Sequence, residues 1–146
     1  MSKWLKILIS ITLFIICIGG VLYYSEYRTK NFVNAVDSDL DNFKYFVDSI
    51  SILEMENDGF NTKLVAANKD EKLYSKLYST LINWEVKRTL TKDFDTKNSY
   101  QIVITRGTHS INTLNVLISK DGIMNFNGKN YQLKKENIEE LLEIIK

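Results

Sequence analysis

The chain has 146 residues, of which 45% are hydrophobic and 25% charged, and its formal net charge is +1. Without Lys3 and Lys6, 17 basic residues face 18 acidic ones, so the rest of the chain lacks the basic excess of a nucleic-acid-binding domain. A single cysteine, Cys17, excludes an intramolecular disulfide and a Cys-based metal site. We therefore expect one domain that binds no nucleic acid, metal or cofactor.

The first segment, residues 1–24, predicts a transmembrane helix. No charged side chain occurs from Ile7 to Tyr24, a run that measures about 27 Å as a helix, against about 30 Å of bilayer hydrocarbon. Aromatic residues typical of a membrane interface stand at its two ends: Trp4, Tyr23, Tyr24 and Tyr27. We expect a single-pass anchor that contacts the lipid bilayer through residues 4–24.

Basic residues beside this span predict its orientation. Lys3, Lys6 and the amino terminus precede the span, and Arg28 and Lys30 follow it. Because Lys and Arg near the span favour the cytoplasmic side, we expect a cytoplasmic N-terminus and an extracytoplasmic C-terminal domain. The many Lys, Asn and Ile residues are typical of a bacterial protein.

The first segment also allows two competing interpretations. A secretory signal peptide would be cleaved, and Gly19-Gly20 offers a small-residue site for this. The apolar run continues past the glycines to Tyr24, which favours a retained anchor. Lipidation of Cys17 requires a small residue directly before the cysteine, where Ile16 stands.

Residues 25–48 predict an amphipathic juxtamembrane helix. Its apolar residues recur at spacings of three and four: Phe32, Val33, Val36, Leu40, Phe43 and Val47. No Pro or Gly occurs between Val21 and Ser49. The anchor can therefore run directly into this helix as one rod, or break near Ser25.

Residues 49–146 predict an extracytoplasmic α+β domain. Its first half contains two short strands, Ile50–Glu56 and Phe60–Ala66, around a turn at Asn57-Asp58-Gly59. A central helix is expected from Lys69 to Trp84, with Leu73, Leu77 and Leu81 stacked four apart and with Asn68 and Glu71 as a capping pair. A short edge strand is expected at Val86, Arg88 and Leu90.

The C-terminal third alternates apolar and polar residues, which predicts an antiparallel meander. Strands are expected at residues 100–105, 114–119, 123–127 and 131–134, separated by turns at Lys120-Asp121-Gly122 and Asn127-Gly128. A final helix from Glu136 to Ile145 follows. We expect about five to six strands, with one face of the sheet buried under the central and C-terminal helices.

One acidic segment superficially matches a calcium-binding loop. Its oxygen ligands would be Asp37, Asp39, Asp41 and Asp48 at positions 1, 3, 5 and 12. Asn42 stands where such loops need Gly, and Asp48 stands where they use Glu. We interpret the carboxylates as the solvated face of the amphipathic helix.

The remaining candidates for chemistry are few. His109, the sole histidine, precedes Ser110 in an expected hairpin loop, but neither has a recognisable orienting partner. The aromatic residues Tyr74, Tyr78, Phe126 and Tyr131 are expected in or beside the core, and a minority of aromatics in a partner interface. We predict no catalytic, cofactor-binding or metal-binding residue.

These observations favour a non-enzymatic interaction or accessory protein, anchored in a bacterial membrane and bound to a protein partner there. A second hypothesis is a structural subunit, because an apolar helix that continues into an amphipathic helix and is capped by a sheet resembles the layout of type IV pilins. The sequence departs from that family: it has no leader ending in Gly and no Glu at the fifth mature position. The sequence is also compatible with a secreted protein whose signal peptide is cleaved, and with an enzyme that uses an unfamiliar site.

Overall fold

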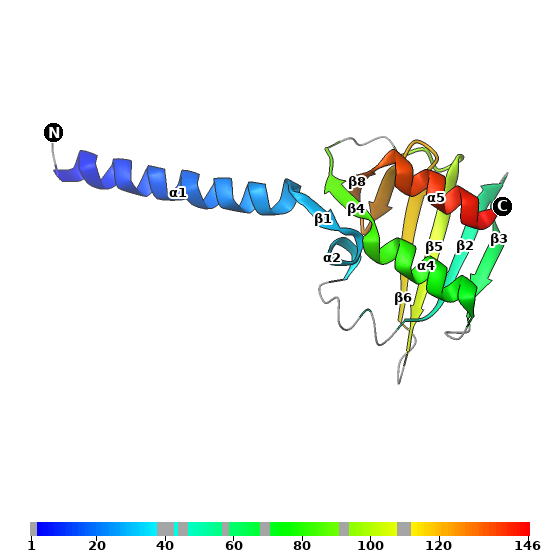
Figure 1. Cartoon of the computed structure of the whole chain (residues 1–146). Helices are drawn as coiled ribbons and strands as arrows, with labels where there is room; N and C mark the ends of the chain where they lie inside the picture. The colour runs from blue at the N-terminus through cyan, green and yellow to red at the C-terminus, as the bar shows by residue number, and fades with distance from the viewer. Residues whose placement is uncertain are drawn as a thin grey trace.

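The computed structural model describes residues 3–37, 43, 47–56, 59–67, 71–90, 94–107 and 112–146. A long N-terminal helix leads into an antiparallel sheet with helices on one of its faces (Figure 1). The predicted α+β class is confirmed. The sheet has eight strands rather than five or six, because short strands add to one of its edges.

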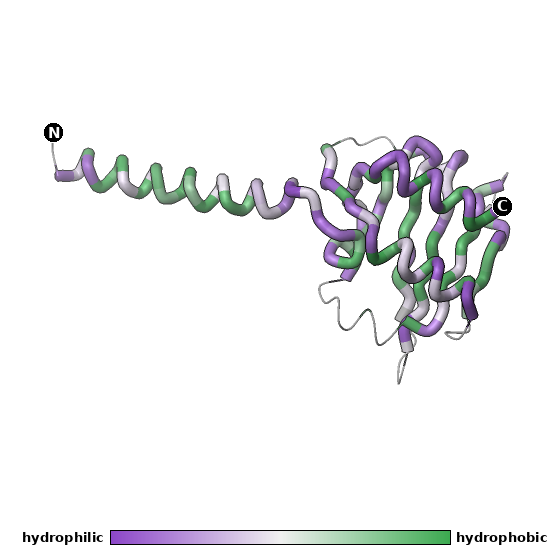
Figure 2. Tube along the Cα trace, viewed as in Figure 1, coloured by the Kyte–Doolittle hydropathy of each residue, from purple (hydrophilic) through white to green (hydrophobic). Residues whose placement is uncertain are grey.

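Helix α1 extends over 25 residues, Lys3–Tyr27, and projects away from the rest of the chain (Figure 1). It is long and apolar enough to cross a membrane, and none of its residues is buried. Figure 2 shows apolar residues along most of its length. The hydroxyl of Thr12 donates to the carbonyl oxygen of Leu8 at 3.0 Å, so this polar group is satisfied within the helix.

The segment 25–48 differs from the expected single helix. Helix α1 ends at Tyr27, after which Thr29–Asn31 form strand β1 and Phe32–Val36 form the short helix α2. Val47 already belongs to strand β2, Val47–Glu56. The predicted continuous amphipathic helix is therefore wrong for the described residues, and the chain leaves the helix at Arg28 rather than near Ser25.

Tertiary contacts explain this difference. Strand β1 pairs with strand β4, Glu85–Arg88, and the backbone N–H of Phe32 donates to the carbonyl oxygen of Trp84 at 2.8 Å. The side chain of Asn31 accepts a hydrogen bond from the N–H of Val33 at 2.9 Å and caps α2. The described apolar residues of this set are buried, but they do not lie along one helix: Phe32, Val33, Val36, Phe43 and Val47. Leu40 lies outside the described residues.

The strand order of the sheet is β1-β4-β8-β7-β6-β5-β2-β3, and each neighbouring pair is antiparallel. The strands not yet given are β3 (Gly59–Ala66), β5 (Ser99–Arg106), β6 (Asn112–Ser119), β7 (Ile123–Phe126) and β8 (Lys129–Leu133). The β2–β3 hairpin and the predicted meander, β5 to β8, are both present. Strand β4 contains Val86 and Arg88 of the predicted edge strand but not Leu90, and it is not at the edge, because β1 pairs with its outer side.

Helices α4 (Lys72–Asn83) and α5 (Lys135–Ile145) lie on one face of the sheet (Figure 1). The two helices and the sheet contribute these fully buried aliphatic side chains: Ile50, Ile52, Leu77, Leu81, Ile102, Ile104, Ile118 and Leu141. Each such side chain contributes about 1.5–3 kcal/mol to folding. Glu71 is the N-cap residue of α4 but makes no side-chain capping bond, and Asn68 and Lys69 lie outside the described residues.

The turn between β7 and β8 is the Asn127-Gly128 turn that the sequence predicts. Both residues have positive φ, 49° and 73°, and Phe126 pairs with Lys129 across them. Two successive positive φ values are characteristic of a type I′ turn, whose twist matches that of the strands.

Among the described residues, no helix lies on the other face of the sheet. From Ser49 to Met55 of β2, and on β5, β6, β7 and β8, the alternate residues on this face are uncharged and include the half-buried Leu53, Val103 and Leu117. The amide of Gln101 donates to the side-chain oxygen of Asn115 at 3.2 Å. This face therefore combines amide and hydroxyl groups with aliphatic side chains.

Candidate functional site

The end of helix α1 and the edge of the sheet form an open groove, which we call the neck. It is lined by Tyr23, Tyr24, Tyr27, Arg28, Thr29, Lys87, Arg88, Thr89 and Leu90 and has a volume of about 620 Å³. The pairing of Thr29 with Lys87 brings the two parts of this set together, although they are far apart in the sequence. Strand β1 thus forms the neck by pairing with β4, at a position where a continuous helix was expected.

A single carboxylate, that of Glu26, organises the base of the neck. It accepts hydrogen bonds from Lys129 Nζ at 3.1 Å, from Lys30 Nζ at 3.5 Å and from the guanidinium of Arg88. The Arg88 guanidinium also lies over the ring of Tyr27, 5.4 Å from its centroid. These contacts join the last turn of α1 to strands β4 and β8, which lie next to each other in the sheet.

Two further cations line the neck. Arg28 and Lys87 are exposed, and neither side chain has an ion-pair partner within the part of the chain that the structure describes. Since Glu26 already faces three basic side chains, the neck carries a clear excess of positive charge.

Exposed apolar groups stand beside these cations. Tyr23 and Tyr24 are 62% and 71% exposed, and Leu90 is 72% exposed. Outside α1, the described part of the chain exposes only one other large hydrophobic side chain to a comparable degree, Val65 on the edge strand β3. The neck therefore combines aromatic rings, an exposed leucine and unpaired cations on one surface.

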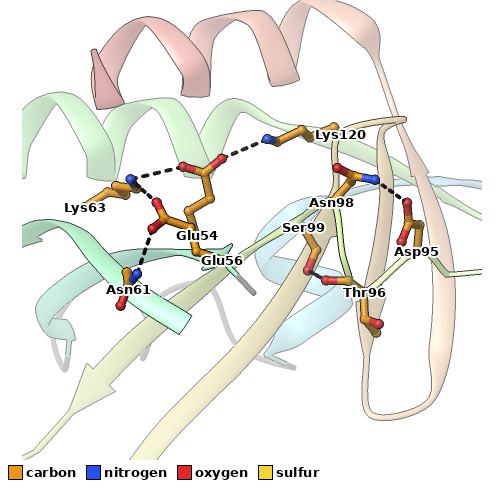
Figure 3. Close-up of polar contacts among 9 residues, drawn as sticks. All are labelled: Glu54, Glu56, Asn61, Lys63, Asp95, Thr96, Asn98, Ser99 and Lys120. Carbon is orange, nitrogen blue, oxygen red and sulfur yellow. Dashed lines mark hydrogen bonds and ion pairs between the residues drawn. The ribbon is translucent and has the colours of Figure 1, made fainter. Parts of the chain in front are cut away.

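A second polar cluster lies at the β3 edge of the sheet (Figure 3). The carboxylate of Glu54 bridges Lys120 Nζ at 2.8 Å and Lys63 Nζ at 3.3 Å, and Lys63 also pairs with Glu56 at 2.5 Å. Asn61 donates to Glu56 at 2.8 Å. The cluster ties β2 to β3 and to the turn after β6.

The charges of this cluster stabilise one another. The hydrogen bond from Lys120 lowers the pKa of Glu54, and the same bond raises the pKa of Lys120. The hydrogen bond from Lys63 lowers the pKa of Glu56, and the bond to Glu56 raises the pKa of Lys63. All four groups stay ionised at neutral pH, which suits an ion-pair network better than general acid–base chemistry.

The neighbouring turn before β5 is held by side-chain capping (Figure 3). Asp95 accepts hydrogen bonds from the side chain of Asn98 at 2.8 Å and from the backbone N–H of Lys97 at 2.9 Å. The hydroxyl of Ser99 donates to the carbonyl oxygen of Thr96 at 2.7 Å. These are local bonds that shape the turn.

Of the residues that the sequence singled out for chemistry, the structure describes only Asp37 and Asp48. Asp37 forms an ion pair with Arg106, and Asp48 lies within strand β2. Asp39, Asp41, Asn42, His109 and Ser110 lie outside the described residues. Among the residues described, no group of three His, Cys, Asp or Glu side chains has a geometry that could hold a metal ion.

Three of the four singled-out aromatic residues are core residues, as predicted. Tyr74, Phe126 and Tyr131 are buried, and Tyr78 is half-buried. The hydroxyl of Tyr74 donates to the carbonyl oxygen of Val47 at 2.9 Å, and burial raises the pKa of Tyr74 to about 12. This residue therefore connects α4 to the start of β2.

Comparison with protein-family models, with curated proteins and with solved structures gave no match. The neck was not predicted from the sequence, because its cations come from two separate segments, with Arg28 in one and Lys87 and Arg88 in the other. The only local signal was the position of Arg28 just after Tyr23, Tyr24 and Tyr27.

Proposed function

We propose that this chain is a single-pass membrane protein whose α+β domain works at the membrane surface as a non-enzymatic interaction or accessory module. The observation that carries the proposal is the exposure of α1, none of whose residues is buried. Burying apolar surface is worth about 25 cal/mol per Å², so an apolar helix of this length is strongly disfavoured in water. A bilayer satisfies both its apolar side chains and its internally bonded backbone.

The position of the domain supports the same proposal. A helix of 25 residues measures about 37 Å, slightly more than the hydrocarbon core. Tyr23, Tyr24 and Tyr27 then reach the interface, and the sheet begins directly beyond it. We propose that α1 is retained rather than cleaved, that the N-terminus is cytoplasmic and that the domain faces outward, as the flanking Lys and Arg residues favour.

We further propose that the partner is another protein of the same bacterial membrane, bound by the helix-free face of the sheet. The cores of protein interfaces are depleted in charged residues, and the alternate residues on this face are uncharged from Ser49 to Met55 of β2 and on β5, β6, β7 and β8. The pilin-like hypothesis rested on a helix that continues past residue 28, whereas α1 ends at Tyr27.

Membrane retention and orientation test this proposal in cells that express the full chain. The chain should resist alkaline carbonate extraction, and its intact mass should include residues 1–24. In a Cys17→Ser background, a membrane-impermeant maleimide should label Ser79→Cys in intact cells but Lys3→Cys only after lysis. Release of the chain by carbonate, or a mass lacking the first segment, would contradict the anchor.

A paired substitution tests whether α1 itself is responsible. Leu13→Arg with Ile15→Arg should move the chain to the soluble fraction, because two arginines near the middle of a span cost about 5–7 kcal/mol of insertion free energy. Leu13→Ala with Ile15→Ala is the matched control and should stay in the membrane. Equal retention of both pairs would mean that another feature holds the chain there.

Site-specific photo-crosslinking tests the partner surface. A photoreactive residue at Leu117 on the helix-free face should give a discrete protein adduct in native membranes. The same residue at Ser79, which is exposed on α4, should give none. No adduct at Leu117, or equal adducts at both sites, would contradict the proposed surface.

A further inference from the structure

We propose that the neck binds the phosphate group of an anionic phospholipid, with Arg28 and Lys87 as the phosphate-binding side chains. This inference rests on the proposed membrane function, because the groove meets lipid only if α1 lies in a bilayer.

The depth of the groove matches the depth of lipid phosphates. The charge-free run of α1 ends at Tyr24, and Arg28 follows four residues later, about 6 Å further along a helix. The headgroup layer extends about 5–7 Å beyond the hydrocarbon on each side. When Tyr24 lies at the hydrocarbon boundary, Arg28 therefore lies within the headgroup layer.

The charges of the groove match a phosphate. Glu26 is occupied by Lys30, Arg88 and Lys129. Arg28 and Lys87 line the groove without an ion-pair partner in the described part of the chain. Arg offers a planar fork of donors that matches phosphate oxygens, and Lys adds a mobile point charge. One anion in the groove can thus be held by Arg28, directly before β1, and by Lys87 on the paired strand β4.

The apolar part of the groove favours a lipid over a free anion. Its volume of about 620 Å³ is in the range of small-molecule sites. The exposed rings of Tyr23 and Tyr24 line the side toward α1, and the exposed Leu90 lines the side toward the sheet. These side chains suit the glycerol and the upper acyl chain, which free phosphate lacks.

Native mass spectrometry of the full chain in detergent tests the inference directly. The probes are phosphatidylglycerol and phosphatidylcholine with identical acyl chains, and inorganic phosphate in a separate arm. The test variant carries Arg28→Gln and Lys87→Gln. The control carries Lys72→Gln and Lys76→Gln, which are exposed in the first half of α4 on the β3 side of the sheet.

The wild-type chain should retain phosphatidylglycerol in preference to phosphatidylcholine. The test variant should lose roughly 30-fold in phosphatidylglycerol affinity, the loss expected for two cations near an anionic surface. The control should keep the wild-type preference, and millimolar inorganic phosphate should not displace the lipid. Equal retention of the two lipids by the wild type, or equal losses in both variants, would overturn the inference, and displacement by inorganic phosphate would assign the site to a free anion.

A separate measurement distinguishes failure of this inference from failure of the proposed membrane function. The wild-type chain is reconstituted into vesicles of phosphatidylcholine alone and washed with alkaline carbonate. If the chain stays in these vesicles but shows no preference for phosphatidylglycerol in native mass spectrometry, the phosphate site is rejected and the membrane anchor is retained as a proposal. Release there rejects the anchor and the phosphate site together.

Discussion

Arg88 on strand β4 is ion-paired with Glu26 in the last turn of helix α1, 62 residues earlier in the chain, and its guanidinium lies over the ring of Tyr27. One side chain thus contacts both a carboxylate and an aromatic ring of the helix end. With the pairing of β1 and β4, it fixes the direction in which α1 leaves the sheet. The contacts of Arg88 with Glu26 and Tyr27 therefore help to define the shape of the neck.

Removal of Arg88 should loosen the joint between α1 and the sheet. In a Cys17→Ser background, spin labels at Gly20→Cys and Asn83→Cys report the distance between α1 and the end of α4 by pulsed electron resonance. Arg88→Ala should broaden the distance distribution, because the ion pair and the cation–π contact are both lost. Lys134→Ala, which removes an exposed ion pair with Glu85, is the control and should leave the distance distribution unchanged. An unchanged width in Arg88→Ala would mean that β1 alone sets the angle.

Glu54 should stabilise the domain in a pH-dependent way. Its pKa is lowered by the hydrogen bond from Lys120, so its stabilising effect is present above its usual pKa of 4.5 and is lost as the pH falls through the folded-state value. At neutral pH, Glu54→Gln should lower the free energy of unfolding by up to about 1 kcal/mol, the upper value for exposed pairs. The difference from wild type should vanish in acid. Chemical denaturation of the full chain in detergent, monitored by near-ultraviolet circular dichroism, measures the free energy of unfolding at neutral and at acid pH.

A suitable control for Glu54 is Glu143→Gln. Glu143 is exposed on α5 and has no ion pair among the described residues. The free energy of unfolding of Glu143→Gln should equal that of the wild type within experimental error at every pH. A pH-independent loss in Glu54→Gln would indicate that the side chain acts by packing rather than by charge.

Tyr74→Phe should destabilise the domain by about 1 kcal/mol, because the buried carbonyl of Val47 loses its hydrogen-bond donor. Tyr78→Phe is the matched control, since Tyr78 is half-buried on the same helix and its hydroxyl has no hydrogen bond to the described residues. Chemical denaturation of both variants at pH 7 checks the difference. Equal losses would contradict the role of the Tyr74 hydroxyl.

The same residue predicts a decline of stability in alkali. Burial raises the pKa of Tyr74 from 10.0 to about 12, so its contribution is complete below pH 10 and is lost as the pH rises toward 12. Wild-type stability should therefore fall more steeply between pH 10 and 12 than that of Tyr74→Phe. Parallel curves would show that other groups account for the alkaline loss.

Gly128→Ala should cost about 1–2 kcal/mol, because Gly128 has a φ of +73° in the turn between β7 and β8. Gly59→Ala is the control: a Cβ there meets nothing within 4 Å, and no positive φ strains it. Thermal unfolding of the two variants should separate them clearly. A similar melting temperature for both would contradict the turn geometry.

Local patterns predicted the meander and the position of α5 well. Alternation placed Tyr100, Ile102 and Ile104 on one face, and the Asn127-Gly128 pair fixed the last turn, because both signals depend only on neighbouring residues. The extra strand β1 has no such signal. Residues 29–31 become a strand only because the unpaired edge of β4 is available to them.

The error over residues 25–48 has the same physical origin. Phe32, Val36, Phe43 and Val47 have helical spacing, and all are buried. Phe32 and Val36 lie in α2, however, whereas Val47 begins β2. The spacing of apolar residues indicates which side chains must be buried, but it does not indicate which other element of the fold buries them. The neck likewise depends on long-range pairing, since Arg28 meets Lys87 and Arg88 only after β1 joins β4.

The depth of Leu90 tests most directly whether α1 lies in a bilayer with the neck at its surface. Spin labels are placed singly at Leu90→Cys and Val65→Cys in a Cys17→Ser background, in the full chain reconstituted into phospholipid vesicles. Both sites are exposed and apolar, but only Leu90 lines the neck. Power saturation should show the label at position 90 accessible to oxygen and shielded from a water-soluble nickel chelate, and the label at position 65 open to the chelate. Equal access of the chelate to both labels would contradict the placement of the neck at the bilayer surface.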